Sequence, residues 1–110
     1  MHSLNTIDEL NHFVQQHPAC LLLFGGVDCG VCQTLKPRIE QLCTEHYPQL
    51  NTAYIDCQQD GRALCAQQSV FSLPVVEWWF GGQCGGRLAR SFALGELKAE
   101  IERPYRLLFA

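Results

Sequence analysis

The strongest constraint on the fold of this sequence is the run "ACLLLF" at residues 19–24, where only a cysteine thiol interrupts the hydrocarbon side chains. A strand with one face in water alternates apolar and polar residues, whereas a strand covered on both faces is apolar throughout. The run therefore predicts a central strand in a sheet that carries helices on both of its faces.

The segments on either side of this strand alternate between helical and strand patterns. Thr6 and Glu9 have the T-x-x-E spacing of a capping box, and apolar residues follow at helical intervals. The predicted elements are a helix at about 7–16, a strand at 19–24, a helix at about 32–46 kinked by Pro37, a strand at 51–56, a short helix in "GRALCAQQS", a strand at 74–80, the turn "GGQCGG", a strand in "RLARSF", and a helix at about 94–102 that Pro104 interrupts.

This order of elements predicts an α/β fold. The first strand–helix–strand unit requires a right-handed parallel crossover, and the last two strands can form an antiparallel hairpin. We therefore expect a central four-stranded mixed sheet flanked by helices on both faces. A chain of 110 residues is long enough for one hydrophobic core, so we expect a single domain over residues 1–110.

Composition narrows the classes of partner and compartment. The net charge is −3 and no basic stripe is present, so we expect no nucleic-acid partner. The apolar runs are too short to span a membrane, and the segment after Met1 lacks the pattern of a secretory signal. Seven cysteines are an odd number and cannot all pair within the chain. These features predict a cytoplasmic protein in which most thiols are reduced.

The pair Cys29 and Cys32, in "DCGVC", lies between the central strand and the next helix. Loops at the carboxyl ends of strands carry the functional sites of α/β folds. A cysteine at a helix N-terminus is acidified, from a pKa of about 8.5 to about 3.5–7.5. We therefore expect Cys29 to be a nucleophile that attacks a disulfide, and Cys32, one turn further, to resolve the mixed disulfide.

Two other interpretations of this pair are a structural disulfide and a metal clip. A structural disulfide is rare in a reducing cytosol. A structural metal site needs about four ligands, and none of the histidines has ligand spacing relative to the pair. Cys57 and Cys65 are the remaining candidate ligands, but there is no second CxxC. We expect neither a metal nor another bound cofactor.

Three stretches together resemble the thioredoxin family, over about residues 5–103: "DCGVC" after an apolar strand, Pro37 within the following helix, and "SLPVV" further along. The resemblance implies a thioredoxin fold and a thiol–disulfide oxidoreductase with Cys29 and Cys32 as its dithiol. It also implies a cis bond between Leu73 and Pro74, which shapes a groove for the substrate chain. The implied partners are protein disulfides, with a thioredoxin reductase or glutathione as electron donor.

The sequence departs from the family pattern at three places. Asp28 replaces the usual tryptophan, and its carboxylate is expected to oppose a thiolate at Cys29. Gly30 and Val31 replace the usual Gly-Pro dipeptide, which tunes the redox potential in the family. Leu23 stands where many members have a buried aspartate that assists the second cysteine. These departures favour an alternative function, a binding or adaptor module with a regulatory or vestigial CxxC.

The other cysteines have apolar or turn surroundings. Cys20 and Cys43 fall on apolar positions and are expected to be buried thiols. Cys57 and Cys65 can pair, but we expect them to be unpaired core or surface thiols. Cys84, in "GGQCGG", is expected to be a turn residue, with glutathionylation or cross-linking of an exposed thiol as the alternative.

The stretch "VVEWW" places a carboxylate, Glu77, within an apolar strand. A buried Glu77 could shuttle protons. The simpler expectation is that its side chain reaches a sheet edge or solvent. Trp78 and Trp79 are neighbours on the strand, so one is expected on each face of the sheet.

Overall fold

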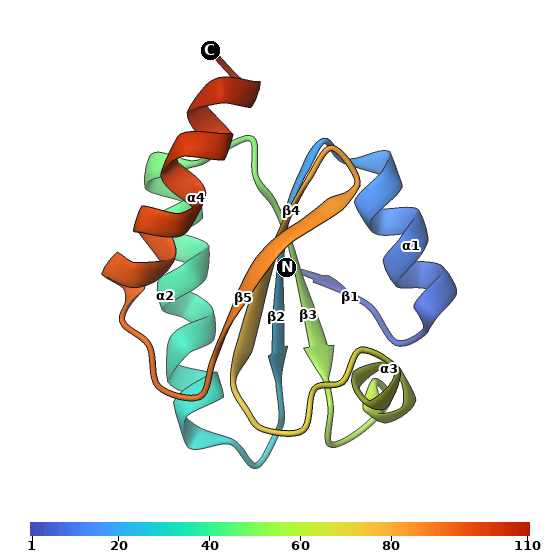
Figure 1. Cartoon of the computed structure of the whole chain (residues 1–110). Coiled ribbons are helices and arrows are strands. Elements are labelled where there is room, and N and C mark those ends of the chain that lie inside the picture. Colours follow the sequence, from blue (N-terminus) through green and yellow to red (C-terminus); the bar gives the residue numbers. More distant parts are fainter.

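Strand β2 (Ala19–Gly25) runs through the middle of the sheet and is buried along its whole length. In the computed structural model, which describes residues 1–110, β2 pairs in parallel with β3 and antiparallel with β4 (Figure 1). The sheet has the order β1-β3-β2-β4-β5. The other elements are β1 (His2–Ser3), α1 (Ile7–Gln16), α2 (Gly30–His46), β3 (Asn51–Asp56), α3 (Arg62–Gln67), β4 (Val75–Phe80), β5 (Gln83–Ala89) and α4 (Leu94–Leu108).

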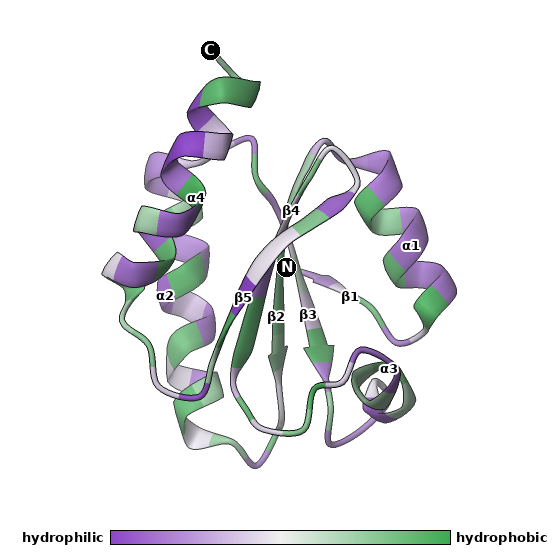
Figure 2. Ribbon diagram, viewed as in Figure 1, coloured by the Kyte–Doolittle hydropathy of each residue, from purple (hydrophilic) through white to green (hydrophobic).

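Helices cover both faces of this sheet, as the apolar run of β2 predicted. Helices α1 and α3 pack on one face, where Leu22 of β2 meets Leu10 and Leu64. Helices α2 and α4 pack on the other face, where Leu23 of β2 meets Ile39 and other apolar side chains. Figure 2 shows β2 as hydrophobic and the helices as mixed, because each helix buries only one of its sides. None of the helices combines the length and the apolar character that a membrane span requires.

The predicted capping box at the start of α1 is confirmed. The Thr6 hydroxyl accepts a hydrogen bond from Glu9 N–H at 3.1 Å, and the Glu9 carboxylate accepts one from Thr6 N–H at 3.0 Å. These bonds satisfy backbone donors that have no partner within the helix. The helix covers Ile7–Gln16, the range that the sequence predicted.

The sheet has five strands rather than the four expected. The additional strand, β1, contains two residues that pair with Ala53 and Tyr54 of β3, and so short a strand has no periodicity that the sequence could show.

The last strand also starts earlier than expected, because "GGQCGG" is only partly a turn. Gly81 and Gly82 have positive φ values of 64° and 78°, which close a two-residue hairpin, so pairing resumes at Gln83.

Two helix boundaries differ from the expected ones. Helix α2 starts at Gly30, two residues before the apolar pattern begins, because Cys29 provides its N-cap. Helix α4 passes through Pro104 and ends at Leu108. Beyond the proline, the ring of Tyr105 is buried and lies 4.9 Å from the ring of Tyr47. This contact stabilises the last turns despite the hydrogen bond that a proline removes.

Glu77 is buried, so the expectation that its side chain reaches a sheet edge or solvent is wrong. Its carboxylate forms an ion pair with Arg87, which is its cross-strand partner on β5, and accepts a hydrogen bond from Trp79 Nε1–H at 3.0 Å. The local sequence does not show the register that brings Arg87 opposite Glu77. The two tryptophans lie on opposite faces as expected: Trp78 belongs to the α2–α4 side and Trp79 packs on the α1–α3 side.

We predict that Arg87→Met lowers the free energy of unfolding by about 3 kcal/mol, because it leaves the buried Glu77 carboxylate without a positively charged partner and bonded only to Trp79 Nε1–H. Urea denaturation measures the change. The double variant Glu77→Leu, Arg87→Met is the matched control and is expected to recover most of the loss, since it buries no charge. A double variant as unstable as Arg87→Met would contradict this account.

Candidate active site

Cys29 is the N-cap residue of α2. The loop that leaves β2 brings it there in an extended conformation, with φ −99° and ψ 100°. Its Sγ accepts a hydrogen bond from the backbone N–H of Cys32 at 3.2 Å. The free N–H groups at a helix N-terminus carry partial positive charge and stabilise a negatively charged sulfur. Position 29 is therefore suited to hold a thiolate.

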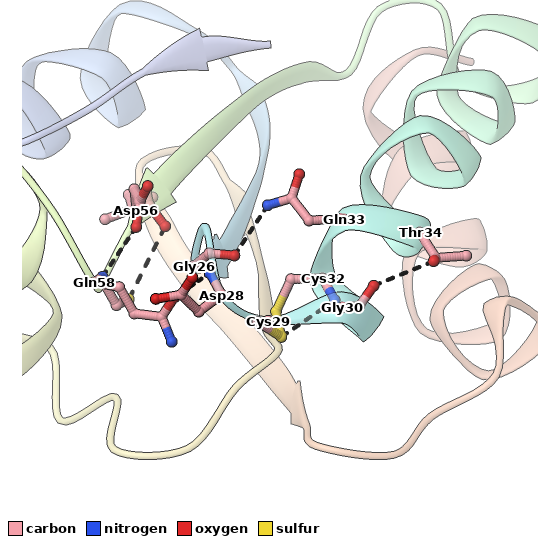
Figure 3. The surroundings of a disulfide bond; sticks show 11 residues. Gly26, Asp28, Cys29, Gly30, Cys32, Gln33, Thr34, Asp56 and Gln58 are labelled. Carbon is pink, nitrogen blue, oxygen red and sulfur yellow. Dashed lines mark hydrogen bonds between the residues drawn. A yellow bond between two sulfur atoms is a disulfide. The ribbon is translucent and has the colours of Figure 1, made fainter.

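Cys29 and Cys32 form a disulfide, with Cα atoms 5.2 Å apart (Figure 3). The two residues differ in exposure. Cys29 is half-buried, whereas Cys32 is 0% exposed and packs inside the protein. An incoming sulfur can therefore reach Cys29, but it cannot reach Cys32 directly.

The two residues between the cysteines face solvent. Val31 is 63% exposed, and a Cβ added at Gly30 would meet no atom within 4 Å. Beside them a shallow groove of about 520 Å³ follows the first turns of α2. The groove is lined by Gly30, Val31, Thr34, Leu35, Arg38 and Phe92.

Gln58, which sequence reasoning did not single out, holds the loop before Cys29. Its side-chain carbonyl accepts a hydrogen bond from Asp28 N–H at 2.7 Å (Figure 3). A Cβ on Gly26 would lie 2.2 Å from the same oxygen, so a side chain at position 26 would displace the Gln58 side chain from this bond. Gln58 and Asp28 are thirty positions apart, and no local pattern reveals their contact.

The side chain of Asp28 is exposed. Water screens an exposed carboxylate, so we expect a smaller effect on Cys29 than adjacency in the sequence suggests. The opposition of Asp28 to the Cys29 thiolate stays a prediction. What the structure adds is a backbone role, since Asp28 N–H anchors the loop to Gln58.

Leu23 is 0% exposed on the face of β2 that α2 covers. Its cross-strand partners are Tyr54 on β3 and Val76 on β4. The core therefore has an aliphatic side chain at the position where many members of the thioredoxin family have a buried aspartate.

The Leu73–Pro74 peptide bond is cis, as expected. Strand β4 begins directly after it, and Val75 pairs with Phe24 near the end of β2. Pro74 therefore lies at the sheet edge from which the loop of Cys29 leaves. None of the backbone hydrogen bonds outside the helices and strands involves Leu73. Its backbone groups can pair with another chain.

Cys57 and Cys65 form a second disulfide, with Cα atoms 5.6 Å apart, so the expectation of unpaired thiols is wrong. The bond ties the loop after β3 to α3. In the same loop, Cys57 N–H donates a hydrogen bond to Gly25 O at 2.8 Å, and the neighbouring residue is Gln58. The second disulfide thus supports the loop that holds Asp28. The sequence shows the two cysteines, but only the path of the loop brings them together.

We predict that the double variant Cys57→Ser, Cys65→Ser lowers the free energy of unfolding by about 2–3 kcal/mol without reductant, because an open loop has more conformational entropy when unfolded. Chemical denaturation measures this. Cys29 and Cys32 are kept oxidised in every protein compared. Cys84→Ser is the matched control and is expected to leave the free energy of unfolding unchanged, since Cys84 is unpaired and exposed. Equal stability of the double variant and the wild type would contradict the bond.

The three unpaired cysteines lie in different surroundings. Burial raises the pKa of Cys20 to about 12. Burial, with a smaller contribution from the Glu40 carboxylate, raises the pKa of Cys43 to about 12. Both are buried thiols, as expected. Cys84 is exposed, and its pKa is raised by partial burial of the sulfur and by the Glu77 carboxylate.

We predict that iodoacetamide labels Cys84 in the native, oxidised protein and leaves Cys20 and Cys43 unlabelled. At pH of about 8, a thiol with a pKa of about 12 is thiolate in about one molecule in 10⁴. Peptide mass mapping identifies the labelled residue, and labelling in denaturant is the control that exposes all three. Labelling of Cys20 or Cys43 at the rate of Cys84 in the native protein would contradict this.

Known proteins resemble the chain over almost all of its length. A model of the Thioredoxin family matches residues 3–103. Thioredoxin-like protein YdfQ of Bacillus subtilis is 24% identical over 107 residues, which cover 97% of this chain and 94% of that protein. Thioredoxin-like 3-2, chloroplastic, of Arabidopsis thaliana is 32% identical over 79 residues, which cover 67% of this chain and 41% of that protein.

Solved structures show the same architecture. The X-ray structure of Fasciola hepatica thioredoxin superposes with a TM-score of 0.83 at 23% sequence identity, covering 94% of this chain and 98% of that one. At this identity the likeness shows the fold alone. The predicted thioredoxin fold is confirmed, with five strands in place of four.

Proposed function

Because this chain belongs to the thioredoxin family, we propose that it is an enzyme, a thiol–disulfide oxidoreductase that acts on disulfides of other proteins through Cys29 and Cys32. The observation that carries the proposal is the asymmetry of the pair. One sulfur is half-buried at a helix N-terminus and accepts a backbone N–H bond, and its disulfide partner is fully buried.

The reaction starts from the reduced pair. The Cys29 thiolate attacks one sulfur of a substrate disulfide, a Cys29–substrate S–S bond forms, and the other substrate sulfur leaves as a thiolate that takes a proton from water. Cys32 then loses its proton and attacks Cys29 Sγ. The Cys29–Cys32 bond forms, and the second substrate sulfur leaves and is protonated. The substrate gains two electrons and the pair is oxidised to the disulfide.

The surface around the site suits a polypeptide substrate. Val27, Val31 and Phe71 are exposed hydrophobic residues, with Phe71 83% exposed. Val27 lies in the loop that carries Cys29, Phe71 lies in the loop that carries Pro74, and Val31 lies in the first turn of α2 between the two cysteines; Figure 1 shows both loops and the start of α2 at the same end of the sheet. Apolar side chains in water at a site favour contact with another protein. The free backbone of Leu73 supports pairing with an extended substrate chain.

The proposal extends to electron donors and compartment. A thioredoxin reductase or glutathione would regenerate the dithiol. The compartment that we propose is the cytoplasm, where the Cys57–Cys65 disulfide would have to resist reduction by the glutathione pool. Reduction by either donor is the reverse of the substrate half-reaction, with attack at the same half-buried sulfur, Cys29.

The second candidate function is a binding or adaptor module in which the CxxC is regulatory or vestigial. The observation that favours it is Leu23, which leaves the buried cysteine without a carboxylate beside it. An adaptor would keep the exposed apolar surface but would turn over slowly. The two candidates therefore differ in catalytic rate and share the same docking surface.

We predict that the protein accelerates reduction of insulin by dithiothreitol, and that Cys29→Ser abolishes the acceleration, since it removes the attacking sulfur. Cys84→Ser is the matched control, because Cys84 is unpaired and outside the site, and it is expected to retain the full rate. If wild-type protein reduces insulin no faster than dithiothreitol alone, the result would favour the adaptor function.

Cys32→Ser is expected to accumulate a mixed disulfide between Cys29 and its substrate, because the sulfur that resolves it is absent. Mass spectrometry of the trapped species identifies the linked residue. A trapped substrate on Cys84 or Cys65 in place of Cys29 would reject the assignment of the attacking sulfur.

A further inference from the structure

The phenolic oxygen of Tyr54 is the one buried side-chain nitrogen or oxygen in the chain that has no hydrogen-bond partner. Buried hydroxyls are almost always paired, because an unpaired one loses its bonds to water without replacement. A partner that is present only in another state of the protein would account for this orphaned group.

Tyr54 lies on β3, directly beside Leu23, on the face that α2 covers. The surroundings of Gly25, at the end of β2, show how near the phenol of Tyr54 is to the redox pair. A Cβ on Gly25 would lie 2.6 Å from Tyr54 Oη and 3.0 Å from Cys32 Cβ. The phenol and the side chain of Cys32 thus pack against the same side of one glycine.

Cys32 needs a hydrogen-bond donor when the disulfide opens. Its side chain is 0% exposed, so water does not reach its sulfur, and burial disfavours the charged thiolate. Leu23 provides no polar group. Once the disulfide opens, Cys32 Sγ can rotate about the Cα–Cβ bond, and the phenol of Tyr54 is the unpaired polar group that packs against the same glycine.

Burial and the Asp56 carboxylate keep the phenol of Tyr54 protonated. Burial raises the pKa of Tyr54, and the Asp56 carboxylate raises it further. The nearby Gln33 amide lowers this pKa through a polar contact that does not meet hydrogen-bond geometry, since its Nε2–H₂ donates to Gly26 O at 2.9 Å. From α2, Lys36 Nζ lies 4.6 Å from the centre of the Tyr54 ring. Near neutral pH the phenol is therefore an O–H donor and cannot serve as a base.

We propose that Tyr54 O–H donates a hydrogen bond to the Cys32 thiolate and so stabilises the sulfur that resolves the mixed disulfide. The inference deepens the proposed oxidoreductase function and rests on it. The Cys32 thiol loses its proton, the thiolate attacks Cys29 Sγ, the Cys29–substrate bond breaks, and the leaving substrate sulfur takes up a proton, so that the step releases no net proton. Tyr54 retains its own proton throughout.

The pH dependence of Cys32 alkylation in a Cys29→Ser background tests the hydrogen bond without using oxidoreductase activity. Iodoacetamide labelling across a pH series, with peptide mass mapping, isolates Cys32 from the other thiols. Loss of the donor disfavours the thiolate, so Tyr54→Phe is expected to move the midpoint of the profile upward by about one pH unit. Tyr47→Phe is the matched control: it removes another phenol, which bonds Glu102, and is expected to leave the midpoint unchanged.

A second measurement uses the intact pair. The mixed disulfide of Cys29 with thionitrobenzoate is followed by mass spectrometry of acid-quenched samples. Tyr54→Phe is expected to slow its decay about threefold near neutral pH, because a roughly tenfold smaller thiolate fraction is partly offset by higher nucleophilicity. Circular dichroism confirms that each variant is folded.

An unchanged midpoint in Tyr54→Phe, or an equal shift in Tyr47→Phe, would overturn the inference. If Cys32 resists alkylation in every variant, the decay of the mixed disulfide becomes the deciding measurement. Equal decay rates in Tyr54→Phe and wild type would then overturn the inference. A shifted midpoint in a protein that fails to reduce insulin would support the hydrogen bond and reject the proposed function. A protein that reduces insulin but shows no shift of the midpoint in Tyr54→Phe would support the proposed function and reject the hydrogen bond.

Discussion

The pairing of β2 along both of its edges is the constraint on which the rest of the structure depends. Because β3 and β4 flank it and helices cover both faces, β2 is buried throughout and ends at a defined point, Gly25. The loop that leaves it must therefore emerge at one edge of the sheet. Pairing of Phe24 with Val75 brings Pro74 to the same edge. One strand thus sets where the site lies and which distant segment shares it.

At that edge, two chemically identical side chains acquire different properties from their surroundings. Cys29 sits where a helix offers unpaired N–H groups and where solvent and substrates can approach. Cys32 sits one turn further, inside the core, where a charge is costly and Tyr54 is the adjacent unpaired polar group. The order of events in a two-thiol reaction follows from this difference in exposure. The two-residue spacer keeps the sulfurs within bonding distance.

The site loop is also supported from β3. Gln58 binds the backbone of Asp28, Cys57 binds the backbone of Gly25, and the Cys57–Cys65 disulfide fixes the segment that provides both contacts. These contacts preorganise the N-terminus of α2, so the position of Cys29 does not depend on the loop alone. Glu77 has a comparable role within the sheet, where its ion pair with Arg87 joins β4 to the edge strand.

The sequence by itself determined the features that arise from short spacing: the buried central strand at 19–24, the capped first helix and the cysteine pair at a helix N-terminus. The cis bond before Pro74 was expected only from the resemblance of "SLPVV" and its context to the thioredoxin family, and the structure confirms it. Apolar period and capping are properties of neighbouring residues, so they can be read locally. Only the tertiary structure decided which residues pair across long separations. The Glu77–Arg87 ion pair, the contact of Gln58 with Asp28 and the second disulfide each depend on the register and path of segments that no local pattern encodes. The surroundings of Cys32 were decided in the same way, because parallel pairing of β2 with β3 places the phenol of Tyr54 beside Leu23.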